Sequence, residues 1–439
     1  MINVNHIKSF KDLNAEEDDN FKEYFVSTKY LSRILSKDSD VIYGTKGSGK
    51  SGLRIALSKF NKDKYLISSF FDLTALSFSS FYFKTQQVNK IVDQEEHHIS
   101  ASIWKNTLLQ YGLYSCIGKV SSTLSNKIYK ALYSNGFVRE NRNKIKNTNI
   151  NFKVMNSFER MFRMFAKLDK GDSIKIGNGQ FHLSAEKESL INQFPMEPIF
   201  DNILNELIEE IKDNNLTILI CIDGLDKIVN HTYESRMAIF NGLIDAVYFF
   251  RFDDRLKSIF SIKAFLPQEL TLETTNEIWD SDKHKHNTHY IQWSQDDLQD
   301  FVYKRLLRTS KNKNAKFEEL WTKIFPSHIE NNVYKVEEDT FQYILRHTLH
   351  RPRQLQDHIF EILRGWLEKT GGTEKIKSSY ITKKVGETNR GLATEVGKHL
   401  SHNYPNIISF LLSWDNNATT TTVSLLKERI SKYLIDDYR

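Results

Sequence analysis

Residues 41–51, with the sequence VIYGTKGSGKS, combine a glycine-rich loop with a lysine and a serine. The loop has the spacing G-x-x-x-x-G-K-S, and apolar segments precede and follow it. Gly44, Gly47 and Gly49 permit backbone torsions that a side chain would forbid, so that successive amides can point at phosphate oxygens. A helix that starts behind the loop adds a partial positive charge. The segment therefore predicts a strand, a phosphate-binding loop and a helix, in that order.

The polar residues of this loop have separate expected roles. Lys50 should reach the β- and γ-phosphates of a nucleoside triphosphate, and the Ser51 hydroxyl should bind Mg²⁺. The residues expected to contact the nucleotide are Gly44, Thr45, Lys46, Gly47, Ser48, Gly49, Lys50, Ser51 and Gly52. The loop therefore predicts binding of a nucleoside triphosphate together with Mg²⁺.

A carboxylate that could complete this site ends an apolar segment much later in the chain. Residues 216–222, LTILICI, are expected to form a buried strand, and Asp223 follows them. A buried carboxylate is costly unless a cation or hydrogen-bond donors compensate its charge. We therefore expect Asp223 to hold Mg²⁺ opposite the loop, the alternative being that it only caps the next helix. Asp226 is the candidate that positions the attacking water, and its alternative role is also a helix N-cap.

The motifs GTKGSGKSGL and LICIDGLDKI resemble those of the STAND and NACHT-type branch of P-loop ATPases, relatives of the AAA+ and origin-recognition ATPases. The segment at 14–26 is similar to the opening of bacterial ATPases of this kind, many of which belong to anti-phage defence loci. The resemblance covers roughly residues 13–60, 214–270 and 288–360. It implies that the nucleotide is ATP, that the chain works as a nucleotide-driven switch, and that a separate effector protein is its partner.

The same resemblance extends to the sequence His350-Arg351-Pro352-Arg353 in the C-terminal third. In related ATPases a Pro-Arg pair opens a lid-domain helix beside the adenine and directs an arginine at the γ-phosphate. Carried over, Pro352 contacts the nucleotide and Arg353 is the lid sensor, with an ordinary exposed helix residue as the alternative for Arg353.

The sequence of this chain differs from that of the related ATPases after the apolar segment at 258–266. Relatives often carry an arginine there, whereas this chain has Leu-Pro-Gln-Glu and places Lys263 inside the segment. No arginine finger is assigned by the sequence, and Arg251 and Arg255 are the candidates. Slow or partner-triggered hydrolysis would follow if the finger came from another subunit.

The elements expected around these motifs predict an α/β fold. Apolar segments typical of strands occur at 41–43, 65–73, 216–222, 258–266 and 288–293. Helical patterns separate them, which indicates a largely parallel sheet with buried strands. The fold class expected is a P-loop NTPase core with a mainly parallel sheet, a helical insertion and a C-terminal helical lid domain.

The chain is too long for one ordinary core, and its organisation changes along its 439 residues. The expected segments are N-terminal helices with the first part of the core (1–73), a mostly helical basic insertion with a β-hairpin (74–205), the second part of the core (206–294), a helical lid domain (295–400) and a small C-terminal helical segment (401–439). The hairpin is expected at 174–183, because its central Asn-Gly suits a tight turn.

Positive charge is concentrated in one stretch of the chain. Residues 119–170 hold twelve lysines and arginines and three acids, whereas the whole chain has a net charge of +6. Interleaved aromatic residues could help such a segment hold DNA or RNA. The alternative is a solvated helical insertion without a nucleic-acid partner.

The cysteine content and hydropathy predict a cytoplasmic protein without a membrane partner. Cys116 and Cys221 are the only cysteines, too far apart in sequence for a disulfide framework. No uninterrupted apolar run approaches the roughly 18 residues typical of a membrane span, and the N-terminus has no apolar signal core. A histidine group at 284–289 does not by itself indicate a metal site.

The leading hypothesis is therefore a Mg²⁺-dependent ATPase that switches conformation or assembly, with a homo-oligomer as one expected form. A DNA-binding ATPase motor or loader is the second hypothesis, since the basic segment could grip nucleic acid. The third is a scaffold that retains nucleotide without hydrolysing it.

Overall fold

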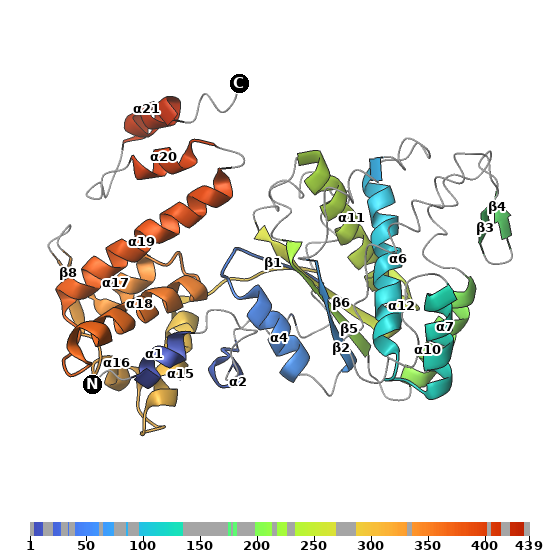
Figure 1. Cartoon of the computed structure of the whole chain (residues 1–439), viewed down its shortest axis with the longest axis horizontal. Coiled ribbons are helices and arrows are strands. Elements are labelled where there is room, and N and C mark those ends of the chain that lie inside the picture. Colours follow the sequence, from blue (N-terminus) through green and yellow to red (C-terminus); the bar gives the residue numbers. More distant parts are fainter. Residues whose placement is uncertain are drawn as a thin grey trace. The chain divides into compact units, whose positions relative to one another are not determined.

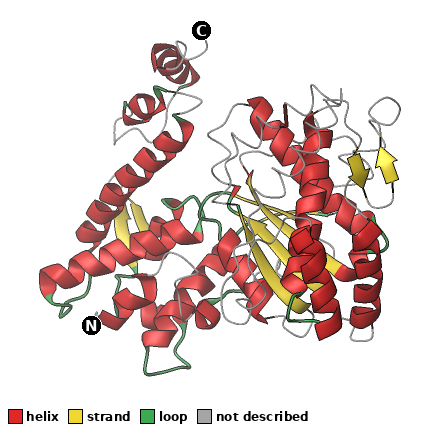
Figure 2. Ribbon diagram, turned by 45° about the vertical axis from the view of Figure 1, so that its right-hand side comes forward, coloured by secondary structure: helices red, strands yellow, loops and turns green. Residues whose placement is uncertain are grey.

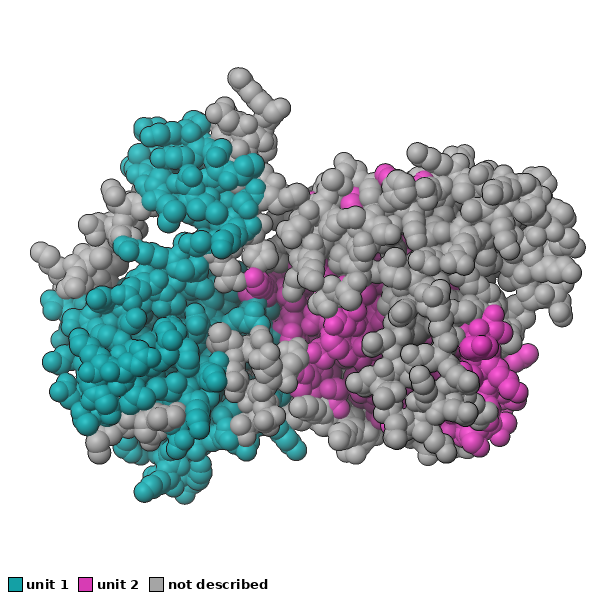
Figure 3. Space-filling view, viewed as in Figure 1, with its two compact units in different colours: residues 1–28, 47–49, 292–439 teal, residues 29–46, 50–291 magenta. Residues whose placement is uncertain are grey.

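The computed structural model describes residues 4–11, 21–27, 34, 40–60, 65–73, 85–86, 96–134, 174–176, 179–181, 198–212, 217–225, 233–268, 287–331, 336–401, 405–413 and 422–433. The chain forms two compact units, coloured separately in Figure 3. The α/β unit contains residues 29–46 and 50–291, and the helical unit contains residues 1–28, 47–49 and 292–439. The middle of the glycine-rich loop therefore groups with the helical unit.

Five strands build the sheet of the α/β unit in the order β2-β5-β6-β1-β7, and every neighbouring pair is parallel. They are β1 (Val41–Gly44), β2 (Tyr65–Asp72), β5 (Thr217–Asp223), β6 (Phe260–Pro267) and β7 (Thr288–Tyr290). The predicted parallel sheet is confirmed, and each of the five expected segments overlaps one of its strands. Ligands of such sheets bind at the carboxyl ends of the strands, which is where β1 and β5 deliver Gly44 and Asp223.

Helices cover both faces of this sheet, as Figures 1 and 2 show. The side chains of β5 alternate between two hydrophobic clusters, because successive residues of a strand point to opposite faces. Ile220 lies in the cluster shared with α6 (Glu96–Cys116) and α11 (Tyr233–Phe252). Leu219 lies in the cluster shared with α4 (Lys50–Phe60). Burial on both faces explains why the strand reads as a continuous apolar run.

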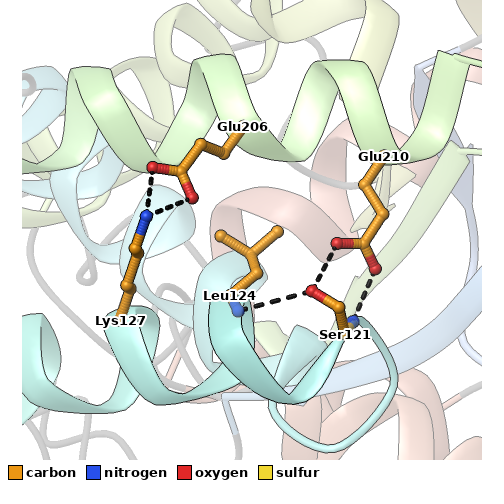
Figure 4. Close-up of polar contacts among 5 residues, drawn as sticks. All are labelled: Ser121, Leu124, Lys127, Glu206 and Glu210. Atoms are coloured by element: carbon orange, nitrogen blue, oxygen red, sulfur yellow. Dashed lines mark hydrogen bonds and ion pairs between the residues drawn. The ribbon is translucent and has the colours of Figure 1, made fainter.

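Two further helices of the α/β unit pack against each other, α7 (Ser122–Ser134) and α10 (Pro198–Lys212). The Lys127 ammonium lies 2.7 Å from the Glu206 carboxylate, and the Ser121 hydroxyl donates to Glu210 at 2.8 Å (Figure 4). An antiparallel pair, β3 (Ile174–Ile176) and β4 (Gly179–Phe181), lies where the sequence predicts a hairpin. Most of the basic segment at 119–170 lies outside the described residues.

The helical unit confirms the expected C-terminal helical domain. Its helices are α1 (Val4–Lys11), α2 (Phe21–Tyr24), α15 (Gln295–Thr309), α16 (Phe317–Trp321), α17 (Thr340–Arg346), α18 (Pro352–Thr370), α19 (Ser378–Leu400), α20 (Ile407–Leu412) and α21 (Val423–Tyr433). The N-terminal helices belong to this unit: Gln356 donates to the carbonyl of Phe10 at 3.1 Å, and Lys304 donates to that of Phe25 at 2.8 Å.

A short antiparallel pair in this unit corrects the expectation that strands end before residue 295. It consists of β8 (His328–Asn331) and β9 (Val336–Asp339). The helix that follows this pair, α17, begins at Thr340, with Asp339 as its N-cap. Sequence patterning missed the pair because β9 is acidic and largely exposed, so it shows no apolar face.

In the described part of the chain, no helix combines the length and the apolar character that a membrane crossing requires.

Candidate functional site

The glycine-rich loop has left-handed backbone at two of its glycines. Gly47 has φ +82° and Gly49 has φ +98°, a region that side chains other than glycine rarely adopt. Gly44 instead ends strand β1, and its φ is not positive. The expectation of forbidden torsions therefore holds for Gly47 and Gly49, while Gly44 ends the strand from which the loop departs.

Lys50 begins α4 and is buried, with 7% of its surface exposed. Its ammonium donates to the carbonyl of Gly44 at 2.9 Å and to that of Thr45 at 3.4 Å. The side chain thus folds back over the start of the loop. Its three N–H donors can also serve phosphate oxygens, for which a lysine acts as a point charge.

Ser51 and Asp223, expected on the two sides of a metal ion, lie together in the α/β unit. The Ser51 hydroxyl donates to Asp223 Oδ2 at 3.3 Å. The other carboxylate oxygen, Oδ1, accepts from the backbone amide of Gly224 at 2.9 Å. Asp223 is 8% exposed. The strand end and the first turn of the helix therefore place two oxygen side chains side by side, 172 residues apart in sequence.

Sequence reasoning missed Arg54, which lies beside the same carboxylate. Its Nε is 3.8 Å from Asp223 Oδ2, and its guanidinium carbon lies 3.7 Å from the centre of the Phe70 ring. The sequence did contain a signal for Arg54. It follows Lys50 by four positions, so the two residues lie on the same face of α4. Arg54 is 8% exposed, so its charge acts in a poorly screened environment.

The middle of the loop packs within the helical unit, against Trp293 and Arg353. The Trp293 indole donates to the carbonyl of Ser48 at 2.7 Å, and the Arg353 amide donates to that of Gly47 at 3.4 Å. A Cβ added to Gly47 would lie 3.3 Å from Arg353 Cβ, and one added to Gly49 would lie 3.5 Å from the Trp293 ring. Both glycines therefore also permit close packing.

The remaining predicted residues lie as follows. Pro352 is buried at the start of α18, where proline is favoured because the first helical amide has no partner inside the helix. Ser48 is buried, Thr45 and Lys46 are half-buried, and Gly52 lies in the first turn of α4. Arg353 is exposed on α18. Asp226 lies outside the described residues.

Lys263 and the two arginine-finger candidates, Arg251 and Arg255, have other carboxylate partners in the α/β unit. Lys263 donates to Asp40 Oδ1 at 3.3 Å, and Arg251 Nε lies 3.5 Å from Asp40 Oδ2. Asp40 directly precedes β1, at the end of the strand opposite to the loop. Burial lowers the pKa of Lys263, and Asp40 opposes that shift. Arg255 pairs with Asp201 at 3.1 Å. Among the described residues, these contacts provide no sensor at Asp223.

The chemistry of the site suits a hard cation. Hydroxyl and carboxylate oxygens are ligands that Mg²⁺ accepts, and Mg²⁺ takes its other ligands from phosphates and water. Ser51 and Asp223 would be the protein ligands. The described residues contain no group of three or more His, Cys, Asp or Glu side chains placed to hold a metal. A metal at Asp223 would therefore depend on a bound phosphate for part of its coordination.

The two cysteines take no part in this chemistry. Both are free and buried, and burial raises the pKa of Cys221 to about 12. The Cys221 thiol therefore stays protonated at neutral pH and packs as an apolar side chain.

Comparison with known proteins matches one region of the chain. Residues 296–385 are similar to the FunZ-associated C-terminal helical domain. The match covers α15 to α18 and the start of α19, within the helical unit. A search among curated proteins found no match for the chain.

Proposed function

We propose that this protein binds ATP with Mg²⁺ and hydrolyses it to ADP and phosphate. The observation that carries the proposal is the distance of 3.3 Å between Ser51 Oγ and Asp223 Oδ2 at the carboxyl end of a parallel sheet. The glycine-rich loop supplies amides for the phosphates, and Lys50 supplies a positive charge. Asp223 and Ser51 would hold the metal that neutralises charge on the transferred phosphoryl group.

We further propose that hydrolysis serves a switch rather than a metabolic reaction. The chain resembles STAND and NACHT-type ATPases in its two motifs, and the described part of the α/β unit offers no assigned arginine finger. Both features favour slow or partner-triggered turnover. A role in bacterial anti-phage defence with a separate effector protein follows from the resemblance alone, and the cytoplasmic location proposed for the chain follows from its cysteine content and hydropathy. The match to the FunZ-associated helical domain supports treating residues 296–385 as a helical domain, and its coupling to the nucleotide is part of this proposal.

The test measures Mg²⁺-dependent phosphate release by the full chain. Lys50→Ala should lower the rate at least about 100-fold, because a phosphate-contacting charge is lost in the transition state. Lys130→Ala changes an exposed lysine on α7 and serves as the matched control. Circular dichroism on both variants separates loss of activity from loss of folding. Equal turnover in wild type and Lys50→Ala would refute the proposal.

A nucleic-acid partner is the second outcome that this assay can detect. In the described part of the basic segment, Lys127 is already paired with Glu206, while Lys119 and Lys130 are exposed. Adding duplex or single-stranded DNA or RNA should leave the rate unchanged if the basic segment is a solvated insertion. Stimulation that decreases steeply with salt would instead favour a DNA-binding motor or loader.

A further inference from the structure

Two successive carbonyls of the glycine-rich loop have donors in the helical unit. The Trp293 indole N–H contacts the carbonyl of Ser48 at 2.7 Å. The Trp293 ring is half-buried and packs edge-to-face on Phe301 of α15, with ring centres 6.0 Å apart. The donor is therefore held by packing from a second side, which limits the directions it can take.

The second donor is the backbone amide of Arg353, in the first turn of α18. Amides in the first turn of a helix have no partner inside the helix, and Pro352 before it has no N–H. The N–H of Arg353 is therefore the first N–H of α18 that can donate a hydrogen bond. Its acceptor is the carbonyl of Gly47, at 3.4 Å. The distance is long for a hydrogen bond, so Trp293 makes the stronger of the two contacts.

Because the peptide group is planar, these two contacts also determine the direction in which the next loop amides point. The described peptide bonds are all trans. In a trans peptide, the carbonyl of one residue and the amide of the next point in opposite directions. A Ser48 carbonyl held at Trp293 turns the Gly49 amide away from Trp293. A Gly47 carbonyl held at α18 likewise turns the Ser48 amide away from the helix.

We propose that Trp293 is a positioning residue for phosphate binding, which orients the amides of Ser48 and Gly49 toward a bound phosphate by holding the Ser48 carbonyl on the opposite side. The inference rests on the proposed function, because it assumes that the loop binds a polyphosphate. Trp293 makes no contact with the phosphate in this account. Its effect is to reduce the reorganisation that the loop undergoes when the anion binds.

Trp293→Phe tests this role, since it removes the N–H and keeps an aromatic ring against Phe301. Trp366→Phe is the matched control: the Trp366 indole also donates to a backbone carbonyl of the helical unit, that of Glu374, at 3.0 Å. Displacement of a fluorescent ADP analogue would measure the affinities of ATP, ADP and inorganic pyrophosphate. Trp293→Phe should weaken all three by about three- to tenfold, as expected for one lost hydrogen bond, and Trp366→Phe should change none.

Comparing the loss of affinity for pyrophosphate with that for ATP shows whether Trp293 acts through the phosphate contacts. A loss of the same factor for pyrophosphate and for ATP supports the inference, because pyrophosphate has only the phosphate contacts. Unchanged pyrophosphate affinity in Trp293→Phe would overturn it, and so would equal losses in both variants, which indicate a general loss of stability. If the wild-type chain binds no nucleotide, the proposed function itself fails. If it binds nucleotide and Trp293→Phe binds equally well, only the inference fails.

Discussion

Two buried aspartates lie at opposite ends of the same parallel sheet, and their neighbours differ. Asp40 precedes β1 and is 4% exposed, with the ammonium of Lys263 at 3.3 Å and the guanidinium of Arg251 at 3.5 Å. Asp223 ends β5 and is 8% exposed. The Ser51 hydroxyl lies 3.3 Å and the Arg54 guanidinium 3.8 Å from its carboxylate.

The difference separates a structural carboxylate from one suited to a ligand. A buried charge must be compensated, and Asp40 has a fully buried lysine and an arginine for this purpose. Asp223 accepts hydrogen bonds from a hydroxyl and an amide and lies 3.8 Å from a guanidinium, and its carboxylate and the neighbouring hydroxyl are oxygen ligands of the kind that a divalent cation accepts. Because Ser51 follows the glycine-rich loop, we propose that this cation is Mg²⁺, bound together with a phosphate.

The largest effect on stability is expected when Lys263 is removed. Lys263→Met removes the fully buried cation at Asp40, while Arg251 is partly exposed, so the free energy of unfolding should fall by about 3–5 kcal/mol. Urea denaturation followed by circular dichroism measures this change. Lys127→Met is the control, because its pair with Glu206 is half exposed and should contribute at most about 1 kcal/mol. Equal losses in the two variants would mean that Asp40 does not depend on Lys263.

A smaller effect is expected from His358, a third kind of buried ionisable group that has no opposite charge. Burial lowers its pKa to about 4, with neighbouring His347 as a second cause. The unfolded chain, with a pKa near 6.5, then binds more protons than the folded chain at intermediate pH. Stability should be fully present above pH 6.5 and decrease as the pH falls toward 4, by about 2 kcal/mol between pH 7 and pH 5.

Denaturation of the wild type and of His358→Leu at both pH values measures this dependence. His358→Leu should remove most of the pH-dependent loss, whereas His328→Gln, which changes an exposed histidine, should keep it. An identical pH dependence in His358→Leu would assign the effect to other groups. His347 is the first of these, since burial also lowers its pKa to about 4.

The smallest effect on stability is expected from Arg251, the second cation at Asp40. Its side chain is 28% exposed, so water screens part of its interaction with Asp40. Arg251→Met should lower the free energy of unfolding by about 1 kcal/mol in the same urea assay. A loss as large as that of Lys263→Met would show that both cations are required equally.

The sequence was sufficient to predict the parallel sheet and the proximity of Ser51, after the glycine-rich loop, to Asp223, at the end of β5. Apolar runs located all five parallel strands, because strands buried on both faces contain few polar residues. The loop spacing and the strand-end position of Asp223 placed Ser51 and Asp223 at the same edge, since parallel strands end together. These inferences needed only local patterns and one rule of topology.

Other parts of the site depend on tertiary contacts that no local pattern encodes. Asp40 and Lys263 are 223 residues apart, and nothing around either residue indicates the pair. The acidic, exposed strand β9 shows no apolar alternation, so the sequence contains no signal for a strand inside the expected helical domain. Trp293 lies in a segment that the resemblance includes, but its contact with Ser48 depends on how residues 47–49 pack in the helical unit.

Calorimetric titration of ATP, with and without Mg²⁺, into the wild type and into Asp223→Asn measures whether Asp223 holds the metal. We expect Mg²⁺ to tighten ATP binding to the wild type by about tenfold or more, and to leave Asp223→Asn nearly unaffected, since the amide carries no charge for the metal. The metal-free affinity of the two proteins should differ little. An equal gain from Mg²⁺ in both proteins would show that Asp223 does not hold the metal.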